Sequence, residues 1–230
     1  MKTTSTKPLS SQTVKQYGTE SGAAVVGIAA SKDFKKAPKG FSPADIMTEC
    51  RSVIVLGAPF PKEVLRSITE YTAMRNEMVS KMTEIAKKVE KLIKKSGYKA
   101  KAISAIGGKY IDGNHHGFIS LKHAAELAGL GIIGKNYLLT NEQYGNLLWL
   151  SAVLTDAELK PDQKAKYKIC DNCGKCVEAC PSGALKNYSP NAKSAQFGKK
   201  ACSQFYKIVN KKLEIQCFAC RTVCPYGKTK

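Results

Sequence analysis

The chain has 230 residues, 43% of them hydrophobic, which is enough to bury a large core in one domain or in one medium and one small domain. Its first 20 residues lack the apolar stretch of an export signal, and no apolar run approaches the roughly 18–20 residues that cross a bilayer. We therefore expect a cytoplasmic protein with no membrane span. Lysine and arginine outnumber aspartate and glutamate by 37 to 18, a balance typical of polyanion-binding proteins or of a lysine-rich surface.

Short apolar runs alternate with helical segments up to about residue 155, a pattern typical of an α/β domain. A sustained 3/4 spacing of apolar residues predicts one long helix, in which Met74, Met78 and Met82 are expected to fill the core. The expected elements are buried strands at 23–28 and 52–56, the long helix at 63–96, a strand at 101–106, a helix at 119–128 and a strand at 147–154.

A connection at residues 159–168 separates this region from a more basic segment that holds eight of the nine cysteines. We predict two domains, an α/β domain at residues 1–160 and a smaller domain at residues 161–230. The smaller one carries 15 basic and 4 acidic side chains, counted from residue 160.

The most specific pattern in the chain is Cys170-x2-Cys173-x2-Cys176-x3-Cys180-Pro181, which has the spacing of bacterial ferredoxins. In such a run three thiolates ligate one [4Fe–4S] cluster, and the fourth reaches a neighbouring cluster. Downstream, Cys217-x2-Cys220-x3-Cys224-Pro225 repeats the last three positions of the run.

Glu214 occupies the position where this second run lacks its first cysteine, and Cys202 is the unused cysteine nearby. A helix over 203–210 would bring Cys202 back to the site. A structural zinc site is the alternative, but zinc sites use pairs of cysteines. Cys50 remains outside and is expected to be a buried apolar side chain. The two expected ligand sets are interleaved, with Cys170, Cys173, Cys176 and Cys224 on one [4Fe–4S] cluster and Cys180, Cys202, Cys217 and Cys220 on the other.

A glycine-rich segment at residues 129–136 matches two nucleotide-binding patterns in part. Gly129, Gly131 and Gly134 fit the dinucleotide fingerprint, and with Lys135 and Asn136 they come close to a P-loop. Both patterns require a strand before the glycines and a helix after them. Here a predicted helix precedes them, and Asn136 replaces the Ser or Thr that would hold magnesium. We therefore expect no nucleotide site.

Three features together carry a resemblance to a known family: the segment Ala128-Gly-Leu-Gly-Ile-Ile-Gly-Lys-Asn136, the cysteine layout, and Arg51-Ser-Val-Ile-Val-Leu-Gly57. They resemble epoxyqueuosine reductase and, more distantly, the reductive dehalogenases. The resemblance implies a short form without the C-terminal helical-repeat extension, in which a corrinoid-reductase-like α/β domain precedes a ferredoxin-like double-cluster domain. It also implies cobalamin between the domains, approached by Gly129, Gly131, Gly134, Lys135 and Asn136.

The catalytic segment of this family runs aromatic-Val-Asp and continues, a few residues later, to Glu-Arg. Lys109-Tyr-Ile-Asp112 resembles its first part, but the following loop is longer, and Leu121-Lys122 occupies the position of Glu-Arg. Aligned without a gap, His115 rather than Asp112 falls at the acid position. Asp112, His115 and His116 are therefore all candidate proton donors.

The resemblance predicts a corrinoid-dependent iron–sulfur reductase that removes oxygen or halide in a two-electron step. It implies an electron donor such as ferredoxin or flavodoxin, and tRNA as a further partner. A first alternative is an electron-transfer or activator protein that delivers low-potential electrons to a partner enzyme. A second is an RNA-binding protein whose clusters are structural, for which the affinity would fall steeply with salt.

Overall fold

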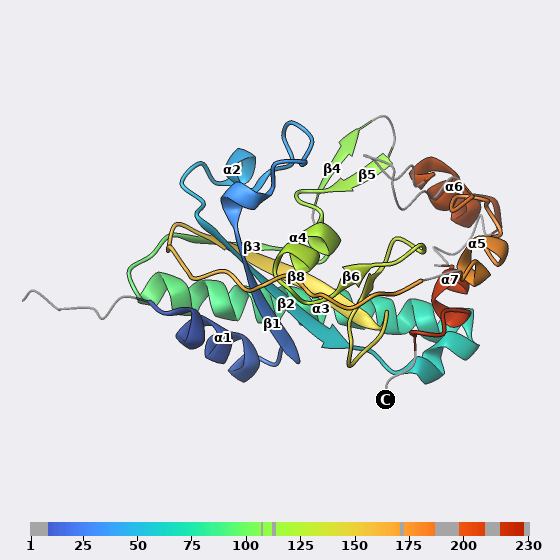
Figure 1. Cartoon of the computed structure of the whole chain (residues 1–230), viewed down its shortest axis with the longest axis horizontal. Coiled ribbons are helices and arrows are strands. Elements are labelled where there is room, and N and C mark those ends of the chain that lie inside the picture. Colours follow the sequence, from blue (N-terminus) through green and yellow to red (C-terminus); the bar gives the residue numbers. More distant parts are fainter. Residues whose placement is uncertain are drawn as a thin grey trace, which may run out of the picture.

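In the computed structural model the described residues are 9–106, 108–111, 114–170, 173–186, 198–209 and 217–227. A four-stranded sheet forms the centre of the molecule (Figure 1), and each pair of neighbouring strands in it is antiparallel. β2 and β8 lie in the middle, which explains why nearly every residue of both strands is buried. The strand order is β1 (Val25–Ala30), β2 (Ser52–Pro59), β8 (Leu148–Thr155) and β3 (Ala100–Ile103).

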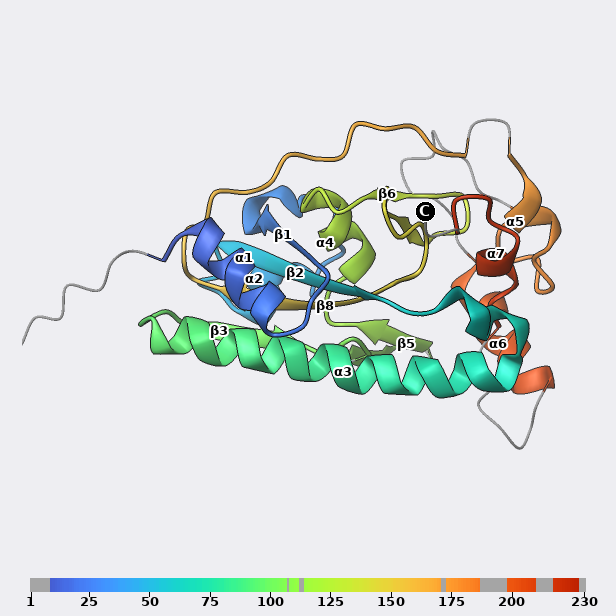
Figure 2. The ribbon, with the colours of Figure 1, turned by 90° about the horizontal axis from the view of Figure 1, so that it is seen from below.

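Helices cover both faces of this sheet (Figure 2). α3 (Ile68–Lys95) and α1 (Ser11–Glu20) pack on one face, and α4 (Leu121–Leu127) packs on the other. Met78 and Met82 of α3 are buried in the core, as predicted, and Met74 is partly buried against it. The layered α/β architecture expected from the alternating pattern is therefore confirmed.

The long helix begins later than its apolar spacing predicted. Lys62–Arg66 forms a 3₁₀ turn, η2, and the side chain of Ser67 then accepts a hydrogen bond from the Glu70 amide at 3.3 Å. This serine caps the first turn of α3, so the apolar residues before it belong to the turn.

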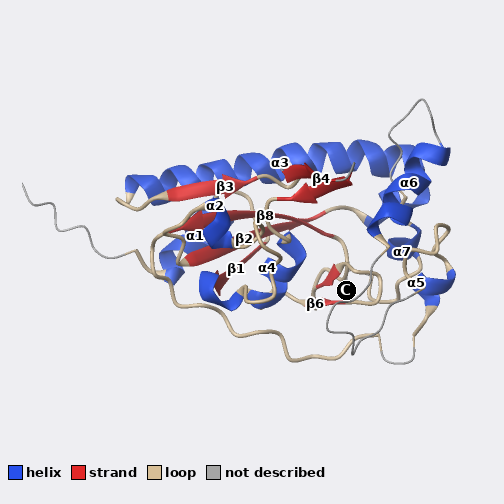
Figure 3. Ribbon diagram, turned by 90° about the horizontal axis from the view of Figure 1, so that it is seen from above, coloured by secondary structure: helices blue, strands red, loops and turns tan. Residues whose placement is uncertain are grey.

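Several shorter elements escaped sequence-based prediction, because two to four residues carry little periodicity. Two small antiparallel pairs, β4–β5 and β6–β7, flank α4 in the chain (Figure 3). The short elements are η1 (Ser31–Asp33), α2 (Pro43–Ile46), β4 (Gly108–Ile111), β5 (Asn114–Gly117), β6 (Ile132–Ile133), β7 (Leu139–Thr140), α5 (Lys175–Glu178) and α7 (Ala219–Thr222). The helix expected at 203–210 is present as α6 (Lys199–Val209).

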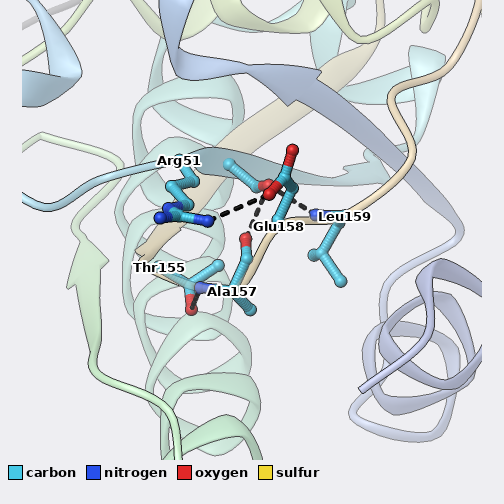
Figure 4. A network of polar contacts seen from close by, with 6 residues as sticks. Arg51, Thr155, Ala157, Glu158 and Leu159 are labelled. Atoms are coloured by element: carbon cyan, nitrogen blue, oxygen red, sulfur yellow. Dashed lines mark hydrogen bonds and ion pairs between the residues drawn. The ribbon is translucent and has the colours of Figure 1, made fainter. Parts of the chain in front are cut away.

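A network of polar contacts fixes the segment that leaves β8 (Figure 4). The Ser52 hydroxyl donates to the Ala157 carbonyl at 2.8 Å and accepts from the Leu159 amide at 3.0 Å. Arg51 and Glu158 form an exposed ion pair at 2.9 Å beside it. These contacts hold the start of the connection to the end of the sheet.

Farther along, the same connection lies against the outer strand. The Asp162 amide donates to the Ile28 carbonyl at 2.8 Å, and the Ile28 amide donates to the Asp162 carboxylate at 2.9 Å. The predicted domain boundary falls within this tethered segment. No helix in the described residues is both long and apolar enough to cross a membrane.

Candidate iron–sulfur site

The cysteine-bearing helices α5, α6 and α7 gather at one end of the molecule (Figure 1). The cysteine region, from Cys170 to Cys224, is long in sequence, yet its helices lie together there. Phe60, directly after β2, and Trp149, the second residue of β8, lie at this end, since both rings contact the Arg221 side chain of α7. α6 contains Cys202, so this helix begins earlier than the expected 203–210 and includes the cysteine itself.

One group of thiols combines the first cysteine run with the last cysteine of the second run. The pKa of Cys176 is raised to about 11, first by burial and then by the nearby thiols of Cys170, Cys224 and Cys173. Burial also raises the pKa of Cys224, and the thiols of Cys170 and Cys173 raise it further. Cys224 therefore lies among the thiols of the first run.

A second group surrounds Cys220. Burial raises the pKa of its thiol to about 12; Arg221 opposes this shift, while the thiols of Cys217 and Cys202, and then that of Cys176 from the first group, add to it. Cys180 differs, because its pKa is lowered. Burial acts against that shift, but hydrogen bonds from the Ser182 side chain and from backbone amides outweigh it. Thiolate character at Cys180 is therefore favoured by its own turn.

The chemistry of these groups fits iron–sulfur ligation. Thiols with raised pKa values stay protonated at neutral pH until a metal centre displaces their protons. No three His, Cys, Asp or Glu side chains in the described part of the chain converge tightly enough to hold a single ion. The spacing of the two cysteine runs and the mutual effects of their thiols support iron–sulfur ligation.

The glycine loop, residues 129–136, lies directly against both thiol groups. The Lys135 amide donates to Cys170 Sγ at 3.5 Å, and Lys135 Nζ donates to the Cys173 carbonyl at 3.0 Å. The buried Asn136 side chain donates to the Cys220 carbonyl at 3.4 Å. Hydrogen bonds to cluster sulfurs are one of the means by which proteins tune cluster potentials.

The glycines of this loop let its backbone pack closely against neighbouring backbone carbonyl groups. Gly129 has φ +73°, and a Cβ atom on it would lie 2.2 Å from the Gln163 carbonyl oxygen. A Cβ on Gly131 would lie 2.4 Å from the Thr140 carbonyl oxygen. The chain enters β6 after them rather than a helix, so neither nucleotide pattern has the context that it requires.

Lys122 is a candidate functional residue that the sequence analysis did not select. There it was noted only because Leu121-Lys122 occupies the position of the Glu-Arg pair in the resembling family. Its Nζ donates to the Tyr137 carbonyl and lies 5.1 Å from the centre of the Tyr137 ring. The pKa of Lys122 is lowered to about 8, first by burial and then by Arg221, against the opposing effect of the Cys220 and Cys202 thiols. A titratable cation therefore lies between the glycine loop and the second thiol group.

Of the three predicted proton donors, His115 and His116 belong to β5. Asp112 and the side chain of His115 lie outside the described residues; the backbone of His115 pairs with Tyr110. The His116 ring lies 5.7 Å from the Phe41 ring, which fixes the hairpin beside the turn at residues 40–41. The roles of these three residues stay predictions.

α7 is anchored to α3 by Phe218, whose ring lies 4.9 Å from the Tyr71 ring of that helix and packs against the main core. We expect Phe218→Ala to lower the free energy of unfolding by about 3 kcal/mol, the cost of deleting a packed aromatic ring. Urea unfolding of the reconstituted protein under anaerobic conditions measures this. The control is Tyr226→Ala, whose side chain is 43% exposed on the same segment. Equal stability of the two variants would show that Phe218 is not an anchor.

Comparisons with known proteins agree with this geometry. Two segments, residues 167–186 and 215–228, match families described as 4Fe-4S binding domains. Epoxyqueuosine reductase of Bacillus subtilis (strain 168) is 32% identical over 127 residues, covering 50% of this chain and 31% of that protein. A tetrachloroethene reductive dehalogenase of Desulfitobacterium hafniense is 33% identical over 142 residues, covering 60% of this chain and 24% of that protein. The chain thus spans a third or less of these two relatives.

Solved structures extend the similarity over 94% of this chain. Epoxyqueuosine reductase from Streptococcus thermophilus superposes with a TM-score of 0.64 at 20% identity, over 65% of its own length. A reductive dehalogenase structure for which a B12-dependent mechanism is suggested superposes with a TM-score of 0.74 at 20% identity, over 31% of its length. The predicted resemblance is confirmed: this chain carries two 4Fe-4S binding motifs on the α/β fold shared by epoxyqueuosine reductases and reductive dehalogenases.

Proposed function

We propose that this chain is an iron–sulfur reductase that uses two [4Fe–4S] clusters and a corrinoid to remove oxygen or halide from its substrate in a two-electron step. One observation carries the proposal: both thiol groups lie against the glycine loop of a fold shared, at a TM-score of 0.74, with a B12-dependent dehalogenase structure. A free-standing electron carrier has no need of that α/β fold, so the reductase is favoured over a carrier.

We assign the ligands in the interleaved manner that the sequence predicts. The mutual effects of Cys176, Cys224, Cys170 and Cys173 support one cluster. The effects of Cys217 and Cys202 on Cys220 support the second cluster, to which we add Cys180 as the remaining ligand. Two one-electron centres side by side can deliver the two electrons in sequence.

A corrinoid bound at the glycine loop, residues 129–136, would supply the cobalt redox chemistry that the two-electron step needs. The chain itself would line the corrinoid site, deliver the electrons through its clusters and supply a proton. We assign the proton to Lys122, because its Nζ lies at the Tyr137 carbonyl directly after the glycine loop and its pKa is lowered to about 8. The negative charge of a bound cluster raises that pKa again, which keeps the donor protonated before reaction.

We place the protein in the cytoplasm, where reduced thiols persist. Its formal charge of +19 suits an acidic electron donor such as ferredoxin or flavodoxin, since opposite charges steer association. The same charge suits tRNA, and one related epoxyqueuosine reductase structure contains an epoxyqueuosine-modified tRNA stem loop. The substrate class is therefore either an organohalide or an RNA-borne epoxide.

Turnover by the isolated protein tests this function. The reconstituted protein, with cobalamin and a low-potential viologen reductant, is incubated with 3-bromo-4-hydroxybenzoic acid, the ligand of one related dehalogenase structure, or with an epoxyqueuosine-modified stem loop. We expect release of bromide or loss of the epoxide that requires cobalamin. Electron transfer to an added acceptor without any turnover of either substrate would instead identify a carrier.

A further inference from the structure

Arg221 is a buried cation placed directly after a proposed cluster ligand, Cys220. Its side chain is only 9% exposed. The guanidinium carbon lies 5.1 Å from the centre of the Phe60 ring and 5.9 Å from that of Trp149. An Nη1 hydrogen is donated to the Asn146 carbonyl, and the Asn146 side chain donates to the Arg221 carbonyl at 3.4 Å. Arg221 is thus held in one position by two rings and a buried asparagine.

These partners are all neutral. The ion pairs found among the described residues involve other side chains, and none of them includes Arg221. A buried guanidinium without a counter-charge is costly, so a negative group is expected close by. Arg221 directly follows Cys220 on α7, so its charge lies next to the second thiol group. A [4Fe–4S] cluster with four thiolates carries about −2 when oxidised and would supply the counter-charge.

The first thiol group also has a cation nearby, because Lys135 Nζ donates to the Cys173 carbonyl at 3.0 Å, but Lys135 is only partly buried whereas Arg221 is buried. Val177 follows Cys176 at the position that Arg221 occupies after Cys220. The two cluster sites thus differ in the burial of the neighbouring cation, and the buried charge of Arg221 is screened less by water than that of Lys135.

We propose that Arg221 is a positioning residue that raises the reduction potential of the cluster ligated by Cys220 above that of the cluster ligated by Cys176. Reduction adds one electron from an external low-potential donor to the oxidised cluster and makes it more negative. A fixed cation stabilises the reduced form more than the oxidised form, so electrons collect on the cluster beside Arg221. This inference rests on the two proposed clusters and not on the corrinoid.

Redox titration with dithionite, followed by electron paramagnetic resonance, tests the inference on reconstituted full-length protein without cobalamin. We expect two midpoints in the unmodified protein. Arg221→Met, which keeps a long side chain between the two rings, should lower the higher midpoint by at least about 59 mV, a tenfold change in the one-electron equilibrium. Arg221→Lys keeps the charge and should stay near the original value. The control is Arg51→Met, which removes an exposed guanidinium.

An unchanged higher midpoint in Arg221→Met, or an equal fall in Arg221→Lys, would overturn the inference. Cys173→Ala provides a second measurement that leaves Arg221 untouched. This variant should keep only the cluster of Cys220 and should show the higher of the two midpoints; the lower midpoint would contradict the inference. Because cobalamin is absent, these results do not depend on the reductase function, and a failure to bind cobalamin would leave them unchanged.

Discussion

Replacing Cys224 with alanine is expected to remove the same cluster as replacing Cys173, although the two residues belong to different sequence motifs. The structure places Cys224 among the thiols of the first run, where it shifts the pKa of Cys176. Each single variant should lose about four of about eight irons, and the double variant should lose no more than either single variant. Loss of one shared cluster is the signature of interleaved ligation.

The matched comparison is the pair Cys173→Ala and Cys180→Ala. These residues lie in one run but are assigned to different clusters, so their double variant should lose both, leaving almost no iron or sulfide. Iron and acid-labile sulfide, quantified after anaerobic reconstitution, separate the cases. Suppose that the Cys173 and Cys180 double variant loses only one cluster, while the Cys173 and Cys224 double variant loses both. Each motif then holds its own cluster, and the interleaved assignment is wrong.

Lys122→Met is expected to lower turnover by about 10²- to 10⁴-fold, the usual contribution of a positioned proton donor. The ammonium is the active form, so the rate of the unmodified protein should fall as pH rises through the pKa of Lys122. That pKa is about 8 from the protein alone, and a bound cluster moves the fall to higher pH. The pH profile of bromide release measures both effects.

The control for this variant is Lys91→Met, on the outer face of α3 beside Lys87 and Lys95. It removes the same charge at a distance from the thiols and should leave the rate unchanged. Retention of the alkaline fall in Lys122→Met would assign the proton to another group, and the β4–β5 hairpin with His116 would be the next to test.

The sequence predicted the central elements well because their patterns are long. β2 and β8 appear as continuous apolar runs since they are buried on both faces, and α3 has an apolar stripe of many turns. α1 was not predicted, because its largely polar residues leave few apolar positions to reveal a period; Val14 is its fully buried apolar side chain. A serine cap at Ser10 and packing against α3 form this helix instead.

The candidate site, like the fold, could be predicted from the sequence in part. Cysteine spacing alone indicates the ligands, because cluster geometry constrains how far apart they can lie in sequence. The spacing says nothing about Lys122, Arg221 or Phe218, because their roles arise from burial against residues distant in the chain. Only the fold brings Phe60 and Trp149 to Arg221, and only the fold places Lys135 beside Cys170.

The most direct test of the central claim is anaerobic quantification of iron and sulfide together with a cobalamin titration on the same sample. We predict about eight irons and eight sulfides per chain, and saturable binding of one cobalamin with a shift of its visible spectrum toward the base-off form. Zinc without acid-labile sulfide would contradict the clusters. A full complement of clusters with no change in the cobalamin spectrum would contradict the corrinoid-dependent reductase.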